Sequence, residues 1–394
     1  MARKPVDAHG SIVPPIHLGV TYAHASLASA REAFETLGHG YAYGRMGNPT
    51  VTEFERFLGE IEGVPQANVW ATSSGLSALT LLVFGLTAKS AGGKKRIVTS
   101  SYIYGGAYHQ LKLWADEHGY DIVFLNNPFS LEAWDSALAA TPAAFALLET
   151  PCNPTIDVFD IRAIAEVTSR YGVPLVVDNT LGVALQRPLE LGADVVLHST
   201  TKAINRQSTG LGGALIASAA FVARFESLLN DFDVSNGLIA HPMSAWTSLN
   251  SRKTLRRDML DFSRIALGVA TFLNKHPKIR EVYYPLLPSS RSYDIALRQM
   301  PDGAGGLFSF RVKSFESAQK LVELLKVPYL APHLGHSESL VIHPASTTHG
   351  KLTPEQLASV NIAPEMVRYS VGLGVPEDVI REITEDFAQA LDQI

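Results

Sequence analysis

The chain has 394 residues, 46% hydrophobic and 18% charged, which is the composition of a globular protein long enough for two cores. Its net charge of −5 leaves no basic surplus to attract nucleic acid or anionic lipid. A single Cys excludes an internal disulfide and suits a reducing cytoplasm. The most apolar helical stretch, residues 78–88, is shorter than a bilayer span, and no secretory signal precedes it, so we expect a cytoplasmic protein without membrane contact.

The first part of the chain, residues 1–55, is expected to form an N-terminal arm. It contains Pro14, Pro15 and the turn-rich segment GHGYAYGRMGNPT, and it is too irregular to make a domain by itself. We therefore expect this arm to pack on a neighbouring subunit.

From Arg96 to Ser218, short apolar runs alternate with helical patterns, which is typical of a mostly parallel sheet wrapped by helices. The expected strands are 96–100, 120–126, 143–150, 174–179, 194–199 and 212–218, and the expected helices are 109–117, 131–138 and 161–171. Open sheets of this kind bind ligands beyond the carboxyl ends of their strands. The polar residues that end these apolar runs are therefore the first place to look for chemistry.

After Ser218 the pattern changes to long helical stretches at 221–232 and 244–276, followed by a strand at 306–312 and helices at 315–325 and 377–391. This predicts an α/β fold in which a large domain, residues 56–255, precedes a smaller α+β domain, residues 256–394. The boundary is expected inside one long helix at 245–273.

Asp178 and Lys202 form the most informative pair, because each follows a predicted strand and the two strands are expected to be neighbours. An ammonium group beside a buried sheet must be paired, shifted in pKa or covalently used. An interior salt bridge between the two residues is the alternative interpretation.

Other residue types suited to one anionic, aromatic ligand surround this pair. Ser74, Gly75 and Leu76 precede a helical pattern whose N-terminal N–H groups could hold a phosphate, although a plain Ser cap explains them equally. The remaining candidates are Ser199, Thr201 and Arg45 for the phosphate, Tyr104 for stacking on a ring, and Arg368 for clamping a carboxylate. Together they describe an aromatic aldehyde phosphate on Lys202 with its ring nitrogen paired to Asp178.

The order of motifs resembles the Cys/Met-metabolism family of pyridoxal-phosphate (PLP) enzymes, which includes cystathionine synthases and lyases, methionine γ-lyase and O-acylhomoserine sulfhydrylases. The resemblance extends from about Gly10 to the C-terminus. The motifs are YAYGRMGNPT, SSGLSAL, SYIYGG, ETPCNPT, VVDNT, HSTTK, LVIHPASTTH and VRYSVGLG.

The resemblance implies PLP fold type I, an aspartate aminotransferase-like large domain, and PLP as cofactor. Lys202 would carry PLP as a Schiff base, Asp178 would keep the pyridine nitrogen protonated, and Asn153 would bind the ring hydroxyl. Tyr104 would stack on the ring and protonate the leaving group. The phosphate would be held by Ser74, Gly75, Leu76, Ser199 and Thr201, with Tyr43 and Arg45 from a neighbouring subunit of a homotetramer. Arg368, helped by Ser339, would bind the substrate carboxylate.

The chemistry that the resemblance implies is loss of a group from Cγ of a small amino acid. We expect a γ-lyase acting on a homoserine-type amino acid with an oxygen or sulfur leaving group, such as an O-acylhomoserine, canavanine or a methionine-like compound. The alternative is γ-replacement by an O-acylhomoserine sulfhydrylase, since both reactions pass through one vinylglycine-type intermediate. A non-catalytic PLP-fold binding protein is disfavoured because Lys202, Asp178, Tyr104 and Arg368 are all present.

The sequence departs from the family pattern mainly in the segment after the lysine, TKAINRQSTGLGG. Ala203 replaces the usual Tyr, Arg206 stands where Gly is common, and Asp258 falls at a position that is usually basic. These changes beside the cofactor favour an atypical substrate. Gly106 stands where methionine γ-lyases typically carry Cys, which argues against methionine itself.

Two other classes of enzyme fit the sequence poorly. The glycines at 210, 212 and 213 do not form the fingerprint of a dinucleotide-binding dehydrogenase. The histidines of the second domain lack metal-ligand spacing, so we expect no metal site. The single Cys152 is interpreted as a buried small side chain.

Overall fold

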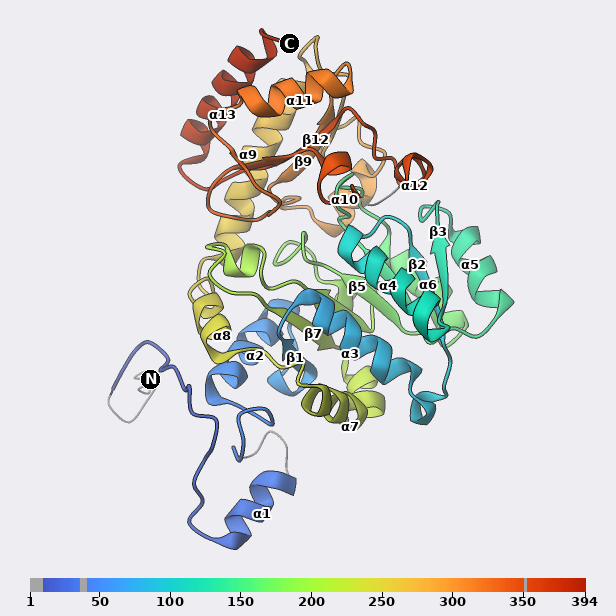
Figure 1. Ribbon diagram of the computed structural model, residues 1–394, viewed down its shortest axis with the longest axis vertical. Helices are drawn as coiled ribbons and strands as arrows, with labels where there is room; N and C mark the ends of the chain where they lie inside the picture. Colours follow the sequence, from blue (N-terminus) through green and yellow to red (C-terminus); the bar gives the residue numbers. More distant parts are fainter. Residues whose placement is uncertain (1–9, 36–40, 351–352) are drawn as a thin grey trace.

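The computed structural model describes residues 10–35, 41–350 and 353–394. Figure 1 shows a larger α/β unit, a smaller unit that carries the C-terminus, and an N-terminal segment that extends away from both. Within the described residues the larger unit is built on a seven-stranded sheet of order β1-β7-β6-β5-β4-β2-β3. Its strands are β1 (Val69–Thr72), β2 (Arg96–Ser100), β3 (Asp121–Leu125), β4 (Phe145–Glu149), β5 (Leu175–Asp178), β6 (Val195–His198) and β7 (Gly213–Ala217).

The large sheet is mostly parallel, which confirms the expected fold class. Strands β2 to β6 run parallel to one another, whereas β7 is antiparallel to both β6 and β1. All six strands expected between Arg96 and Ser218 are present. The sequence does not predict β1, because a buried apolar run of four residues has no periodicity that separates strand from helix.

Helices cover both faces of the large sheet, and successive residues of one strand pack on opposite sides. Ile97 of β2 packs with α3, α4 and α7, whereas the next residue, Val98, packs with α5 and α6. The helices of the larger unit named so far, together with α2, have the bounds α2 (Pro49–Glu62), α3 (Gly75–Thr87), α4 (Gly105–His118), α5 (Leu131–Ala140), α6 (Ile161–Arg170) and α7 (Ala219–Asn236). Among the described residues, no helix is long and apolar enough to cross a membrane.

The single long helix expected at 245–273 is wrong, because two helices occupy this stretch. These are α8 (Pro242–Leu249) and α9 (Leu255–Asn274), separated by turns at 250–254. The hydroxyl groups of Ser248 and Ser251 donate to the carbonyls of Ser244 and Ser248, at 2.8 and 2.9 Å. Ser side chains that bond to the backbone in this way compete with helix continuation. The expected boundary between residues 255 and 256 therefore does not lie inside a helix, and its position stays a prediction.

The smaller unit is built on a five-stranded sheet of order β10-β11-β12-β9-β8 within the described chain. Its strands are β8 (Glu281–Tyr283), β9 (Leu307–Arg311), β10 (Tyr329–Leu330), β11 (Leu340–Ile342) and β12 (Met366–Ser370). Its helices are α10 (Tyr293–Gln299), α11 (Phe315–Leu324), α12 (Pro354–Ser359) and α13 (Pro376–Leu391). Figure 1 shows α9, in yellow, running from the larger unit up beside this second sheet. The smaller α+β unit and its closing helix confirm that part of the expected fold class.

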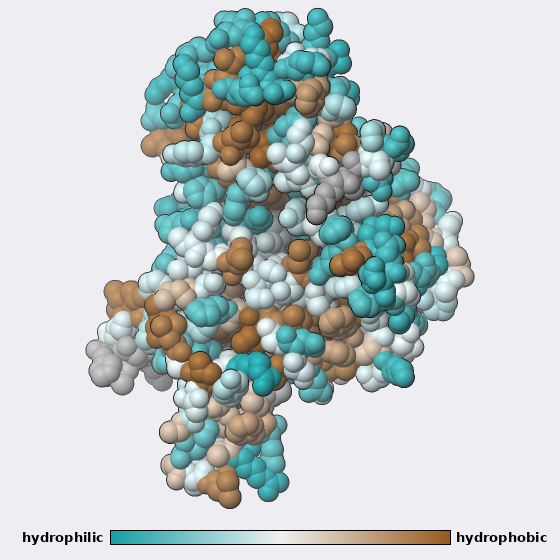
Figure 2. Space-filling view, viewed as in Figure 1, coloured by the Kyte–Doolittle hydropathy of each residue, from teal (hydrophilic) through white to brown (hydrophobic). Residues whose placement is uncertain are grey.

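The N-terminal segment leaves the body of the molecule and carries α1 (Leu27–Glu35), as Figure 1 shows. Residues 1–9 and 36–40 of the expected arm lie outside the described residues. Apolar side chains on this segment are exposed to solvent in the single chain: Ile12, Val13, Leu18, Val20, Leu27 and Phe34. Figure 2 shows apolar residues, in brown, gathered beside the N-terminus. Such a surface is typical of a segment that packs on a partner.

Candidate functional site

A cavity of about 230 Å³ lies beyond the carboxyl ends of β4, β5 and β6, where the topology of an open sheet predicts a ligand site. The cavity brings together ten of the residues that the sequence singled out. They are Ser74, Gly75, Leu76, Tyr104, Asn153, Asp178, Ser199, Thr201, Lys202 and Arg368. Nine come from the larger unit and one, Arg368, comes from β12 of the smaller unit.

Lys202 follows β6 and projects an amine into this cavity without a counter-charge. Among the described residues its side chain has no hydrogen bond and no ion pair, so the interior salt bridge with Asp178 is not formed. Burial lowers the pKa of Lys202 to about 8, and the positive charge of Arg368 adds to this effect. A buried, unpaired amine with a low pKa is suited to covalent attachment of an aldehyde.

Asp178 ends β5, the neighbour of β6, and faces the same cavity. Its Oδ1 accepts hydrogen bonds from the Thr180 amide at 3.0 Å and the Thr180 hydroxyl at 2.6 Å. Its Oδ2 has no partner among the described residues. Burial raises the pKa of Asp178, and the bonds from Thr180 oppose the rise. An incoming cationic N–H, such as a protonated ring nitrogen, would satisfy this carboxylate.

The first turn of α3 forms a cradle of unused donors at one end of the cavity. Ser74 caps the helix, because its Oγ accepts the Ser77 amide at 3.0 Å. The amides of Gly75 and Leu76 have no acceptor within the described chain. A Cβ at Gly75 would come within 3.1 Å of the Ser199 Cβ, so only glycine leaves this approach open. Free amides at a helix N-terminus are the donors that phosphate groups bind.

Two hydroxyl residues complete the cradle from the end of β6. Ser199 lines the cavity, and its hydroxyl has no partner among the described residues. Thr201 is anchored to Gly212, because its Oγ1 donates to the Gly212 carbonyl at 3.1 Å and accepts the Gly212 amide at 2.9 Å. The donor set therefore fits a phosphate, with the amine of Lys202 within the same cavity for an aldehyde and Asp178 for a ring nitrogen.

Glu149 is the residue of this site to which the sequence assigns no role. It ends β4, is buried, and lies beside Asp178 in the sheet register. Its Oε2 accepts the Tyr104 amide at 2.6 Å and its Oε1 accepts the Asn153 amide at 2.8 Å. Burial and the charge of Asp178 raise its pKa. One carboxylate thus fixes the backbone of two residues that line the cavity.

Tyr104 and Gly106 form a matched pair at the start of α4. The Tyr104 side chain is 43% exposed in the single chain, so its ring is open to a ligand. A Cβ at residue 106 would come within 2.9 Å of the Tyr104 Cζ. Gly106 therefore leaves space for the ring, which a larger residue at this position would displace.

Arg368 reaches from the smaller sheet into the cavity. Its Nη1 donates to the Asn153 Oδ1 at 3.0 Å and its Nη2 donates to the His333 carbonyl at 3.0 Å. Burial lowers its pKa to about 10, and no carboxylate in the described chain pairs with it. A buried guanidinium without a counter-ion is suited to a ligand carboxylate.

Three predicted residues lie outside this cavity. Ser339 is buried, and its Oγ accepts the Gly372 amide at 2.9 Å. Tyr43 and Arg45 line a neighbouring surface groove, where Arg45 Nη1 donates to the Val234 carbonyl at 2.5 Å. The predicted role of Ser339 in the same chain, and of Tyr43 and Arg45 in a neighbouring subunit, stay predictions.

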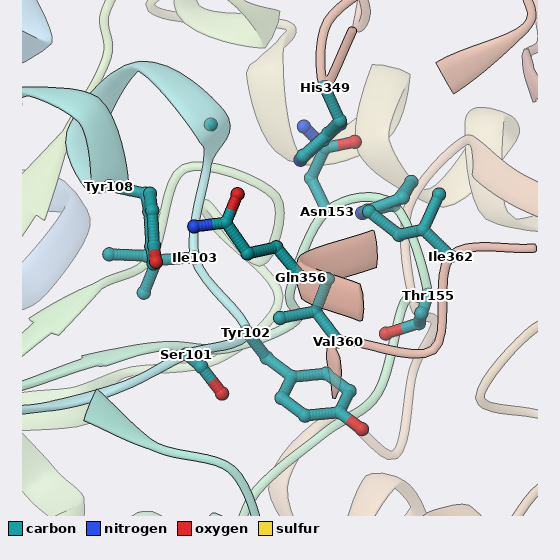
Figure 3. Close-up of a pocket in the computed structure, with 12 residues that line it drawn as sticks. Ser101, Tyr102, Ile103, Tyr108, Asn153, Thr155, His349, Gln356, Val360 and Ile362 are labelled. Carbon is teal, nitrogen blue, oxygen red and sulfur yellow. The ribbon is translucent and has the colours of Figure 1, made fainter. Parts of the chain in front are cut away.

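A second, smaller cavity of about 20 Å³ shares Ile103 and Asn153 with the first, and Figure 3 shows the residues that line it. Gln356 reaches into it from α12, and His349 lines it. Burial, reinforced by Arg368, lowers the pKa of His349 to about 4, so this histidine is neutral at pH 7. The volume is enough for about one water molecule and too small for an amino acid.

Comparison with known proteins agrees with this geometry. Residues 1–392 match the family model described as Cys/Met metabolism PLP-dependent enzyme. An O-succinylhomoserine sulfhydrylase of Pseudomonas aeruginosa is 32% identical, over 98% of this chain and 92% of the relative. An L-methionine gamma-lyase of Fusobacterium nucleatum subsp. polymorphum is 33% identical, over 98% of this chain and 95% of the relative.

Solved structures give the same result. The cystathionine gamma synthase of Xanthomonas oryzae pv. oryzae, in complex with aminoacrylate and cysteine, has a TM-score of 0.87 and 30% identity, over 98% of this chain and 95% of that one. A putative O-acetylhomoserine (thiol)-lyase of Campylobacter jejuni, which holds a pyridoxyl-lysine phosphate, has a TM-score of 0.88 and 28% identity, over 98% and 96%. The chain therefore belongs to the Cys/Met-metabolism family of PLP-dependent enzymes, which are lyases and transferases.

Proposed function

We propose that this chain is a γ-lyase that removes an oxygen- or sulfur-linked group from Cγ of a homoserine-type amino acid, such as an O-acylhomoserine, canavanine or a methionine-like compound. The observation that carries the proposal is the meeting of the unpaired Lys202 amine, the Asp178 carboxylate and the unpaired Arg368 guanidinium in one cavity. An amino acid substrate would place its amine near Lys202 and its carboxylate on Arg368.

The roles of the residues follow from their positions. PLP, when bound, supplies an electron sink for the bonds at the substrate Cα. The phosphate would lie on the amides of Gly75 and Leu76, with the hydroxyl groups of Ser74, Ser199 and Thr201 around it. Asp178 would hold the proton of the ring nitrogen, and Asn153 would bind the ring hydroxyl.

Lys202 and Tyr104 would move the protons. Lys202 has a pKa of about 8, and its amine, when free, would be suited to taking a proton from the substrate Cα and returning it elsewhere. Tyr104 would protonate the leaving group at Cγ. Arg368 would hold the carboxylate and so keep the Cα–H bond oriented toward Lys202.

γ-Replacement, in which a thiol enters at Cγ, is the second candidate. It is favoured by the similarity to O-succinylhomoserine sulfhydrylases, whereas the similarity to methionine γ-lyases favours elimination. Gly106 and the atypical segment after Lys202 support an unusual leaving group rather than methionine.

A substrate panel separates the two candidates. The holoenzyme would be incubated with methionine, homocysteine, cystathionine, cysteine, O-acetylhomoserine, O-succinylhomoserine or canavanine, with and without sulfide. For the lyase we expect oxo acid and ammonia to form without sulfide. The compound that yields them identifies the substrate and its leaving group. A new amino acid that forms only with sulfide would instead establish the sulfhydrylase. Lys202→Ala is the control, because it should lose both the visible absorption of the cofactor and turnover.

The oligomeric state is part of the same proposal. We propose a homotetramer, in which Tyr43 and Arg45 of one subunit reach the phosphate of a neighbour. The exposed apolar residues of the N-terminal segment support contact with another copy of the chain.

A further inference from the structure

Two residues at which the sequence departs from the family pattern, Arg206 and Asp258, form an ion pair with each other. Arg206 lies in the segment after Lys202, and Asp258 lies in the first turn of α9. Arg206 Nη1 also donates to the Thr254 hydroxyl at 2.7 Å. Neither charged residue lines the cofactor cavity. The Arg206 side chain is therefore directed to α9 and does not contact the ligand directly.

Asp258 depends on this pair. Its side chain is 8% exposed, and the one other cation within 4 Å of it in the described chain, Arg257, is 72% exposed and 3.5 Å away. A buried carboxylate that loses its close partner is strongly unfavourable. The Arg206 side chain is therefore firmly anchored on α9.

The same segment also contacts residues 333 and 337, which lie close in sequence to the cavity-lining residues Pro332 and Leu334. The Arg206 carbonyl accepts the Ser337 amide at 3.0 Å. Two residues further on, the Ser208 hydroxyl bonds to His333 Nε2 at 3.2 Å. Ser208 has a φ of 53°, a left-handed conformation that a non-glycine residue keeps only when its surroundings hold it.

These contacts lead to Arg368. The carbonyl of His333 accepts Arg368 Nη2 at 3.0 Å, and its neighbours Pro332 and Leu334 line the cavity. A continuous chain of contacts thus runs from α9 through Arg206 and Ser208 to His333, and from there to the guanidinium that faces the substrate.

We propose that Arg206, anchored by Asp258, is a positioning residue that sets the His333 carbonyl and thereby the orientation of Arg368 toward the substrate carboxylate. The inference rests on the proposed function, because it assigns the carboxylate to Arg368. It also gives the two sequence departures one shared role in substrate binding.

The test uses two small probes that differ only in a carboxylate, L-alanine and ethylamine. Both carry the amine that reacts at the cofactor, and their binding to the holoenzyme is followed by the shift in its visible absorption. In Arg206→Ala we expect the Kd of L-alanine to rise about tenfold and that of ethylamine to change less than about twofold, within the range of indirect coupling. Asp258→Asn should show the same split, and Arg206→Lys a smaller one.

Arg264→Ala is the matched control, since it removes an exposed cation of α9 that pairs with Glu377 and not with Asp258. It should leave both dissociation constants at the wild-type value. Thermal unfolding of each variant checks the fold. Equal weakening of both probes by Arg206→Ala, or a loss of thermal stability with both constants unchanged, would show a purely structural role and overturn the inference.

Arg368→Ala separates this inference from the proposed function. If Arg368→Ala weakens L-alanine selectively but Arg206→Ala does not, only the positioning role fails. If Arg368→Ala affects neither probe selectively, the substrate carboxylate binds elsewhere, and the roles of Arg368 and Arg206 both fail. The substrate panel still decides independently whether the chain is a γ-lyase.

Discussion

The cavity gives the Lys202 amine no counter-charge, and burial lowers its pKa. We therefore expect the uptake of cofactor to depend on pH. Only the neutral amine attacks an aldehyde, and the pKa of Lys202 is about 8. We expect the rate of PLP incorporation into the cofactor-free protein to rise with pH and to level off above about 8. Absorbance after mixing measures this rate.

Arg368→Leu provides a check on the cause. Since the charge of Arg368 contributes to the lowered pKa of Lys202, its removal should move the midpoint to higher pH. A wild-type midpoint near the ordinary lysine value of 10.5 would contradict the described environment of the amine.

Individual residues of the site differ in how far the sequence predicts them. Lys202, Asp178 and Arg368 are predictable because their side chains face the ligand and their chemistry is specific. Glu149 is not, since it acts by accepting two backbone amides, and any residue supplies an amide. The ion pair between Arg206 and Asp258 is also not predictable from the sequence. The two residues are far apart in the chain, and they come into contact only because α9 packs beside the segment after Lys202.

Strand β7 and the start of α3 are in such close contact that a single methyl group added at Gly213 would push them apart. A Cβ at Gly213 would overlap the Ser74 carbonyl and come within 2.6 Å of the Gly75 amide. These are backbone atoms, so they cannot move without shifting the phosphate cradle. We expect Gly213→Ala to raise the Kd for PLP at least about tenfold, because a 1 Å displacement of such donors is costly.

Equilibrium titration of the cofactor-free variant with PLP measures this change. Gly237→Ala serves as a control for loss of glycine itself, since a Cβ there meets nothing within 4 Å, although its φ of 64° carries a small strain of its own. Unchanged PLP affinity in Gly213→Ala would show that the phosphate does not lie at the start of α3.

At the scale of elements, the sequence predicts the strands that end in polar residues and the helices between them. It fails where local patterns are short or interrupted. β1 has only four residues, and the break between α8 and α9 depends on Ser hydroxyl groups that bond to the backbone. β1 leads directly into the Ser74 cradle, and α9 leads into the smaller unit. The geometry of the site therefore could not be predicted from the sequence.

The whole molecule carries an apolar segment that the single chain does not bury. Ile12 is 91% exposed and Leu27 is 87% exposed, so a charge at either position costs the isolated subunit little. If the segment packs on another copy, the same charges become buried and unpaired. We expect Ile12→Asp together with Leu27→Asp to lower the oligomeric state observed by sedimentation velocity.

The matched control is Arg31→Asp with Glu35→Arg, which exchanges two exposed, paired charges on α1 without adding an uncovered one. It should leave sedimentation unchanged. If the wild-type protein sediments as a monomer, the proposed homotetramer is wrong.

The overall architecture of two sheets was within reach of the sequence, because a parallel α/β pattern and a later α+β pattern differ in periodicity. The sequence also predicts that Arg368 of the second domain serves this site, but it does not predict the contact that joins the two units. Arg368 lies on β12 of the second sheet and contacts Asn153 just after β4 of the first, and only the folded chain brings these segments together.

The edge position of β1 also has a consequence for the order in which the protein matures on the ribosome. In the described sheet β7 is the only strand that pairs with β1, although Thr72 of β1 also forms an isolated bridge with Ile239. The loop that follows β1 carries the Ser74 cradle. A nascent chain that has emerged only as far as β6 already contains β1 but lacks β7, the strand that pairs with it. We therefore expect the Ser74 cradle to be completed only after β7 has been made. Arg368, on β12, is made later still, so the part of the site contributed by the smaller unit is the last to form.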